Sequence, residues 1–172
     1  DLKGLLPEEE IQSLIERIVS RGGMVKNLHG QKNLYYQVNA TYYSALGESD
    51  EKMLLARAIQ MFMPGKPQIW YLDLFAGKND HEAVQRAGES GHKEINRTNL
   101  STDQITEGLK KDVVQKQLAL IRMRNTHKAF SEGAEVAISG GERSLEIRWE
   151  YNSAFATLYV NFESGTYTIV ES

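Results

Sequence analysis

Residues 67–75 of the chain read PQIWYLDLF, and this stretch decides which class of fold the sequence predicts. Its apolar residues follow one another without the alternation of a half-exposed strand, so the pattern predicts a strand at 68–74 that is buried on both faces. Such strands belong to parallel sheets covered by helices. Asp73 lies within the run. An acid at the end of a parallel strand is either a functional group or a partner of a neighbouring Lys or Arg, and its position alone leaves both interpretations open.

A helix is predicted directly before this stretch. Ser49 or Asp50 can cap its start, and Pro64-Gly65 ends it. Its apolar stripe consists of Leu54, Leu55, Ala58, Ile59 and Phe62. Helix, short loop and buried strand form an α/β arrangement, yet no other segment is a convincing strand of the same kind. The predicted strand therefore has no parallel neighbour in this sequence.

Three further helices are predicted from their capping signals and helical spacing. One begins at Pro7 and ends at Gly22. Three glutamates follow Pro7 in the first turn, where they interact favourably with the positive end of the helix dipole. Another begins at the capping box of residues 101–104, and the last covers residues 113–124. Residues 77–99 are polar and too long for an ordinary connection, so we interpret them as either functional or disordered.

The pattern changes near Phe130. Apolar and polar residues alternate over 145–150 and again over 155–162, with turn residues between them. This alternation is typical of antiparallel strands. The sequence therefore predicts an α/β region at residues 1–130 and an antiparallel β domain at residues 131–172.

The composition excludes several classes of partner. A chain of 172 residues that is 41% hydrophobic and 25% charged can bury a core. Its net charge of -3 gives no general basic field for nucleic acid, and no apolar run is long enough to span a membrane, so we expect neither partner. Cysteine is absent, which removes disulfides and thiolate sites. The first residue is Asp1 rather than Met, so we interpret the chain as processed or as a piece of a longer protein.

Two segments have the chemistry of a binding site. Residues 33–43 read NLYYQVNATYY and combine amides, hydroxyls and aromatic rings, which suits sugars; an aromatic-rich core loop is the alternative. Arg97 offers a rigid group of five donors for hydroxyls, carboxylate or phosphate, and a solvated surface arginine is the alternative. His81, Glu82 and His92 match no metal-ligand spacing, and nucleotide-binding motifs are absent, so we expect no metal and no cofactor.

Six short segments together indicate a known family. In chain order they are LKGLLP at 2–7, YQVN at 36–39, YYSALG at 42–47, PGKPQ at 64–68, AGKND at 76–80 and INR at 95–97. They resemble the C-terminal portion of the sucrose phosphorylase branch of the α-amylase family of glycoside hydrolases. The resemblance implies an α/β fold class: the C-terminal part of a (β/α)8 barrel over residues 1–130, followed by a small antiparallel β domain. The strand at 68–74 would be the eighth of that barrel, and the helix at 113–124 would follow it.

The resemblance also implies an activity. Family members are retaining enzymes that transfer a glucosyl unit from sucrose or a related α-glucoside to phosphate, through an aspartate nucleophile and a glutamate acid/base. Those carboxylates and a further aspartate match positions upstream of Asp1, so we expect no catalytic residue here and no activity of the isolated chain. Tyr36 and Gln37 match positions on the acceptor or phosphate side, and Arg97 matches an arginine that contacts the glucosyl unit. The implied partners are an α-glucoside and inorganic phosphate, and the implied location is the cytoplasm.

At two positions this sequence departs from the family pattern, and the first leaves more than one acceptor possible. Where the family typically carries an acid that helps hold fructose, two residues before Tyr36, this chain has Leu34, so glycerate or a sugar phosphate becomes an alternative acceptor. Asp73 stands where family members more often carry glycine. The parent could instead be an α-amylase-family hydrolase, or the chain could be a non-catalytic sugar-binding module. Because the neighbours of a barrel's eighth strand are not encoded here, we expect the rest of the barrel to be required for folding.

Overall fold

The computed structural model of the chain describes residues 4–27 and 35–172. The chain divides into two compact units, of which the first comprises Asp1–Glu48 and Trp70–Ile105 and the second Ser49–Ile69 and Thr106–Ser172. Each unit is therefore built from two separate stretches of sequence. The predicted boundary after residue 130 lies inside the second unit, and as a division of a longer protein into barrel and β domain it stays a prediction.

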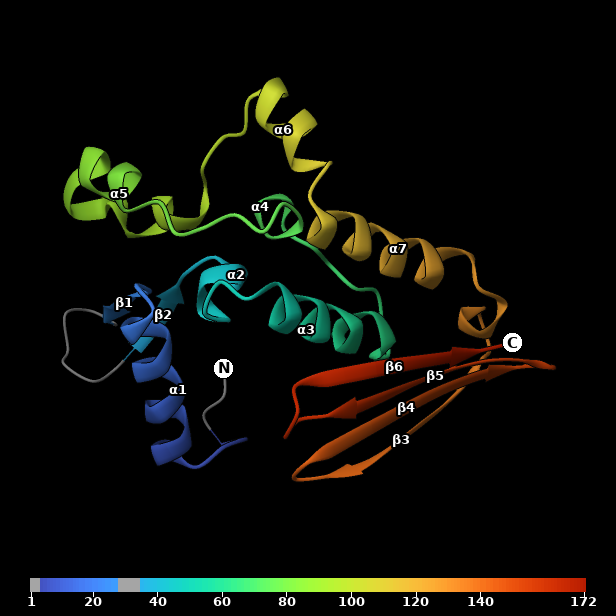
Figure 1. The fold of residues 1–172 in the computed structure, drawn as a ribbon. Coiled ribbons are helices and arrows are strands. Elements are labelled where there is room, and N and C mark those ends of the chain that lie inside the picture. The colour runs from blue at the N-terminus through green and yellow to red at the C-terminus, as the bar shows by residue number, and fades with distance from the viewer. Residues whose placement is uncertain (1–3, 28–34) are drawn as a thin grey trace. The chain divides into compact units, whose positions relative to one another are not determined.

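The first unit consists of short helices and one hairpin. Its elements are α1 (Glu8–Ser20), β1 (Met24–Asn27), β2 (Tyr35–Asn39), α2 (Tyr42–Ala45), α4 (Tyr71–Leu74), α5 (His81–Ala87) and the 3-10 helix η2 (Gly88–Asn96), most of them labelled in Figure 1. The strands β1 and β2 pair antiparallel. As predicted, α1 begins directly after Pro7, and it ends before Gly22, which takes a φ of 84° that favours glycine.

The prediction of a strand at residues 68–74 is wrong. The backbone is extended as far as Trp70, but Tyr71–Leu74 form the helix α4, and residues 66–70 pair with no other described segment. A strand needs a hydrogen-bonded neighbour, and the described part of this chain offers no parallel one. Asp73 instead accepts a hydrogen bond from the backbone N–H of Tyr42 at 2.8 Å and thereby holds the start of α2.

The polar stretch at residues 77–99 forms secondary structure. Asp80 caps the N-terminus of α5, because its side chain accepts a hydrogen bond from the backbone N–H of Ala83. The 3-10 helix η2 follows, and both α5 and η2 lie in the first unit. Disorder, one of the two interpretations of this stretch, is therefore excluded by the structure.

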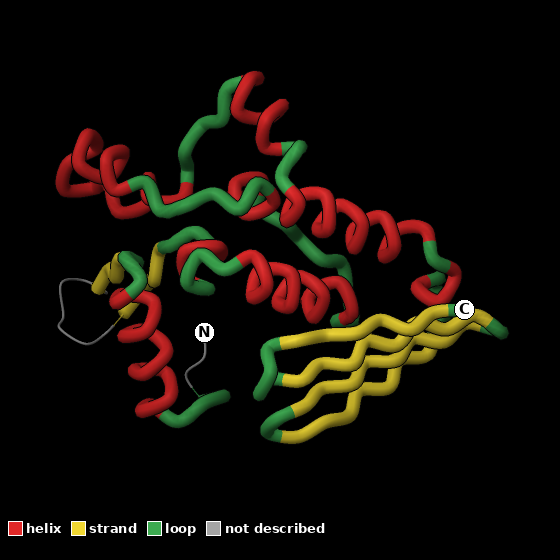
Figure 2. The backbone as a smooth tube through the Cα atoms, viewed as in Figure 1, coloured by secondary structure: helices red, strands yellow, loops and turns green. Residues whose placement is uncertain are grey.

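The second unit packs helices on a four-stranded sheet. Its elements are α3 (Asp50–Phe62), α7 (Asp112–Thr126), the 3-10 helix η3 (Lys128–Phe130), β3 (Glu135–Gly141), β4 (Ser144–Tyr151), β5 (Ala154–Asn161) and β6 (Thr166–Glu171), while α6 (Thr102–Gly108) connects the units along the chain. The strands lie in the order β3-β4-β5-β6, and each pairs antiparallel with the next (Figure 2). The antiparallel module predicted beyond Phe130 is therefore present.

Side-chain capping accounts for where α3 and α6 begin. The Ser49 side chain accepts from the backbone N–H of Lys52 at the start of α3. At the start of α6, the backbone N–H of Ser101 donates to Gln104 Oε1 at 2.8 Å, and the backbone N–H of Gln104 donates to Ser101 Oγ at 3.2 Å. These reciprocal bonds are the predicted capping box. The predicted helix at 113–124 corresponds to α7.

The core of the second unit lies between the sheet and the helices α3 and α7. Its buried residues are Ala58, Met61, Phe62, Leu120, Ala129, Ile147, Trp149, Ala156, Leu158 and Val160. The indole N–H of Trp149 donates to the carbonyl oxygen of Phe62 at 2.6 Å, and the Arg124 guanidinium lies over the Trp149 ring at 4.3 Å. The sheet therefore contacts the last turn of α3 through both apolar packing and a buried hydrogen bond.

A polar pair links the two helices of this unit. Arg57 Nε donates to Gln117 Oε1 at 2.9 Å, and both side chains are buried.

Within residues 4–27 and 35–172, the helices are all too short or too polar to cross a membrane.

Candidate functional site

The hairpin of the first unit carries two of the three residues expected to bind substrate. Tyr36 is part of β2, but its side chain lies outside the described residues. Gln37 is half-buried and lies opposite Lys26 across the hairpin. Its Oε1 atom is buried and has no hydrogen-bond partner in the described part of the chain. A buried acceptor without a donor costs about 1–3 kcal/mol, so Gln37 is suited to accept a hydrogen bond from a ligand.

Arg97, the third expected residue, follows the 3-10 helix η2 directly. Its backbone N–H donates to the carbonyl oxygen of Glu94 at 3.2 Å, and its guanidinium lies 3.7 Å from the Glu94 carboxylate. The Arg97 side chain is 51% exposed. A long, exposed ion pair contributes little, so the five donors of this guanidinium remain available for a ligand.

The structure places Gln37 and Arg97 in the same unit, and η2 packs against the hairpin. Asn96, the residue before Arg97, makes the connection: its Nδ2 donates to the carbonyl oxygen of Ala40 at 3.2 Å, three residues beyond Gln37. The sequence indicated Asn96 only as part of the INR segment and predicted no role for its side chain.

Asn79 fixes the turn between β2 and α2, and sequence reasoning also missed this role. Its Oδ1 accepts from the backbone N–H of Thr41 at 2.7 Å, and its own backbone N–H donates to Ser44 Oγ at 3.0 Å. Thr41 in turn caps α2 by accepting from the backbone N–H of Ser44. Asn79 belongs to the AGKND segment, which indicated the family. The segment does not predict which distant backbone atoms Asn79 binds.

Three cationic side chains lie near His92 of η2. Burial lowers the pKa of His92, and the nearby charges of Lys26, Lys93 and Arg97 lower this pKa further. His92 is therefore neutral at physiological pH while three permanent cations lie around it. Arg97 also lies near the Glu94 carboxylate, so the positive charge beside the hairpin comes mainly from Lys26 and Lys93.

Asp80 holds the other end of the same segment. Its Oδ1 accepts from the backbone N–H of Ala83 at 2.8 Å and its Oδ2 from the Thr98 hydroxyl at 2.9 Å. The first of these hydrogen bonds is the main reason why the pKa of Asp80 is lowered, and the bond from Thr98 adds to it.

We predict that Asp80→Ala lowers the free energy of unfolding by about 1 kcal/mol, because it removes the cap of α5. The folded pKa of Asp80 is lowered, so this contribution is present at neutral pH and disappears as the pH falls through that pKa. Urea unfolding of the full-length protein at neutral and at acidic pH measures both effects. Asp80→Asn is the matched control, since asparagine caps helices about as well as aspartate. Equal stability of Asp80→Ala and wild type at neutral pH would contradict the capping role.

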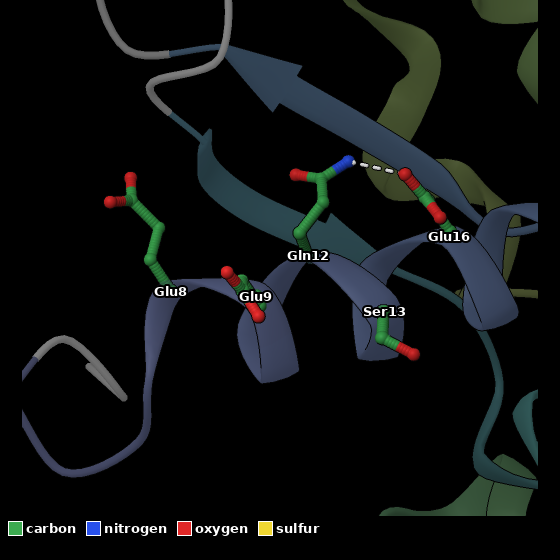
Figure 3. A pocket seen from close by; sticks show the side chains of 5 residues that line it. All are labelled: Glu8, Glu9, Gln12, Ser13 and Glu16. Atoms are coloured by element: carbon green, nitrogen blue, oxygen red, sulfur yellow. Dashed lines mark hydrogen bonds between the residues drawn. The ribbon is translucent and has the colours of Figure 1, made fainter.

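A shallow depression along α1 has no substrate-binding character. Glu8, Glu9, Gln12, Ser13 and Glu16 line it, and Gln12 donates to Glu16 at 2.8 Å (Figure 3). Its three carboxylates repel phosphate, and none of the expected site residues takes part. Among the residues that the structure describes, no group of three His, Cys, Asp or Glu side chains could hold a metal ion.

Comparison with known proteins gives several sugar phosphorylases as relatives. No family model matches the chain. A sucrose 6(F)-phosphate phosphorylase of Ilumatobacter coccineus is 52% identical over 170 residues, which cover 97% of this chain and 32% of that protein. A sucrose phosphorylase of Agrobacterium vitis is 40% identical over 178 residues, covering 98% of this chain and 35% of that protein.

The chain resembles the C-terminal part of the sucrose phosphorylase family. The resemblance expected from six short segments is thereby confirmed. The chain spans about a third of the length of the curated relatives that it matches.

A solved structure of this family confirms the predicted fold class. The crystal structure of sucrose 6F-phosphate phosphorylase from Thermoanaerobacter thermosaccharolyticum matches with a TM-score of 0.92 and 37% identity, covering 99% of this chain and 34% of that one. The chain therefore has the fold of the C-terminal portion of a sucrose phosphorylase and ends in an antiparallel β domain.

Proposed function

We propose that this chain is the C-terminal part of a retaining α-glucoside phosphorylase, which transfers a glucosyl unit to phosphate and releases glucose 1-phosphate. The observation that carries the proposal is the 52% identity to a phosphorylase over nearly the whole chain. The preceding part of the protein would complete the (β/α)8 barrel and supply the nucleophile and the acid/base of a retaining mechanism. The present chain would supply substrate-binding groups. Phosphate and sugar phosphates are at hand in the cytoplasm, which is the location we propose.

Different residues of this site would bind the glucosyl unit and the acceptor or phosphate. Arg97 would donate hydrogen bonds to the hydroxyls of the glucosyl unit, since its guanidinium is half-exposed and only weakly paired. Gln37 would accept a hydrogen bond from the acceptor or from phosphate through its unpartnered Oε1 atom. By the family resemblance, Tyr36 would also line the acceptor side. The positive charges around His92 would favour phosphate.

We further propose that the substrate is sucrose 6(F)-phosphate, with sucrose as the alternative. Phosphorolysis would then give glucose 1-phosphate and fructose 6-phosphate. Two observations favour the phosphorylated substrate: the relative with 52% identity carries that name, and Leu34 replaces the acid that the family uses to hold fructose. A carboxylate at that position would repel the phosphate of the acceptor, and leucine would not.

The test is product analysis with the full-length protein. We expect α-glucose 1-phosphate from sucrose 6(F)-phosphate and phosphate, with a higher kcat/KM than from sucrose, and ¹H NMR of the anomeric proton reports the stereochemistry. Release of glucose alone would identify a hydrolase. If neither product forms from any α-glucoside tested, while the protein binds glucose, the sugar-binding module is the better interpretation.

We predict that residues 1–172 expressed alone do not fold cooperatively. In the first unit Leu5, Leu14 and Val19 are 76%, 43% and 43% exposed, and no strand among residues 4–27 and 35–172 pairs with the extended stretch before α4. The missing part of a longer protein would cover these apolar surfaces. Differential scanning calorimetry of the fragment and of the full-length protein makes the comparison. A sharp, cooperative transition of a monomeric fragment would show that the rest of the barrel is not required.

A further inference from the structure

Two adjacent aromatic residues bind the backbone on either side of Arg97. The rings of Trp70 and Tyr71 lie next to each other, with centroids 4.9 Å apart and planes inclined by 49°. The indole N–H of Trp70 donates to the carbonyl oxygen of Asn96 at 2.9 Å, and the Tyr71 hydroxyl donates to the carbonyl oxygen of Thr98 at 2.8 Å. Asn96 and Thr98 are the residues immediately before and after Arg97.

Burial does not explain these two aromatic residues. Trp70 is 49% exposed and Tyr71 is 37% exposed, although both are large side chains that usually contribute buried area. The indole N–H of Trp70 and the hydroxyl of Tyr71, in contrast, each donate a hydrogen bond. Two specific donors therefore converge on one short backbone segment that holds a residue expected to bind substrate.

Further bonds fix the same three residues while leaving the Arg97 side chain unconstrained. The Asn96 side chain donates to the carbonyl oxygen of Ala40, and the Thr98 hydroxyl donates to Asp80. Arg97 itself makes one backbone hydrogen bond and the 3.7 Å ion pair with Glu94. The segment thus combines a rigid backbone with an available guanidinium, which is the arrangement that preorganised binding requires.

We propose that Trp70 and Tyr71 are positioning residues for Arg97. By holding the carbonyl groups before and after it, they fix the direction in which the Arg97 side chain leaves the backbone. Its guanidinium then meets the glucosyl hydroxyls without a further loss of conformational freedom on binding. What Arg97 binds rests on the proposed function; that these two side chains fix its backbone rests on their two hydrogen bonds, to the carbonyl oxygens of Asn96 and Thr98.

The kinetic test uses the full-length protein and removes single donors. Tyr71→Phe deletes one hydroxyl, and Trp70→Phe deletes the indole N–H. Tyr159→Phe is the matched control, because the hydroxyl of this exposed tyrosine of β5 makes no hydrogen bond with another described residue. We expect Tyr71→Phe to raise KM for the α-glucoside and lower kcat/KM by roughly 3- to 10-fold. A purely structural loss would lower the amount of active enzyme, and hence kcat, at unchanged KM.

A double-mutant cycle with Arg97→Lys makes the kinetic test specific. If Tyr71 acts through Arg97, the Tyr71→Phe effect falls to less than about 2-fold in the Arg97→Lys background. Hydrogen–deuterium exchange gives a readout that needs no activity. Amides of residues 95–99 are expected to exchange roughly 10-fold faster in Tyr71→Phe and Trp70→Phe, and at the wild-type rate in Tyr159→Phe.

The outcomes separate this inference from the proposed function. If the wild-type protein forms no glucose 1-phosphate, the proposed function fails, and the exchange rates still decide whether the backbone around Arg97 is held. If the wild type is active and Arg97→Lys is impaired, but the aromatic variants keep wild-type KM and exchange, the inference is overturned and the function stands. Faster exchange at unchanged KM also overturns it, because the aromatic residues would then hold the backbone without positioning Arg97.

Discussion

Replacing Arg97 by alanine in the full-length protein is expected to lower kcat/KM for phosphorolysis by roughly 10- to 150-fold. A charged donor that hydrogen-bonds substrate contributes about 1.5–3 kcal/mol, and this range converts to the expected loss in rate. The free energy of unfolding should change little, because the Arg97 side chain is half-exposed and its ion pair with Glu94 is 3.7 Å long. Initial rates over a range of α-glucoside concentrations, together with thermal melting, measure both quantities.

The chain offers a closely matched control for this variant. Arg86 lies in the same unit, is 68% exposed, and also forms a 3.7 Å ion pair, in its case with Glu82. Arg86→Ala removes the same charge and a comparable surface contact, so it should leave kcat/KM within about 2-fold of wild type. A similar loss in both variants would trace the effect to general electrostatics rather than to a specific contact of Arg97, and would contradict its proposed role.

Leu158→Ala is expected to lower the free energy of unfolding by about 2–5 kcal/mol. Leu158 is 0% exposed and lies in the central strand pair of the sheet, opposite Ile147 on one side and Ile169 on the other. Alanine would leave a cavity between the sheet and the helices, which the close-packed surroundings can fill only in part. Urea unfolding of the full-length protein measures the loss.

Val170→Ala is the control for the cavity effect. Val170 lies on the neighbouring strand β6 but is 44% exposed, so its truncation should cost less than about 1 kcal/mol. If the two variants were equally destabilised, the inner face of the sheet would not form the core of the unit.

Elements that depend on neighbouring residues in the sequence were predicted well. The helix start at Pro7, the Ser49 cap and the capping box of Ser101 and Gln104 are all present, because each is decided by hydrogen bonds within one helical turn. The alternation at 145–150 likewise gave the buried and exposed faces of β4. These predictions succeeded because the deciding contacts are local or follow a fixed period.

Features that depend on distant residues were not predictable from this sequence. The apolar run at 68–74 has the composition of a buried strand, yet its last four residues form α4, because a strand without a neighbour has no partners for its backbone. The bond from Asn96 to Ala40 spans 56 residues, and the bond from Trp70 to Asn96 spans 26. No periodicity encodes such contacts. Resemblance to a family supplied Gln37 and Arg97, whose roles stay predictions, as does that of Tyr36.

The shared core of the second unit has a consequence for how this family evolves. Phe62 and Leu120 pack against the sheet, and the Phe62 carbonyl accepts from Trp149, so the C-terminal sheet shares one core with α3 and α7. Recombination between lineages at residue 130 would join helices to a sheet selected against other partners. Surviving chimaeras should therefore inherit α3, α7 and the sheet from one parent, and substitutions at these contact positions should be correlated across lineages.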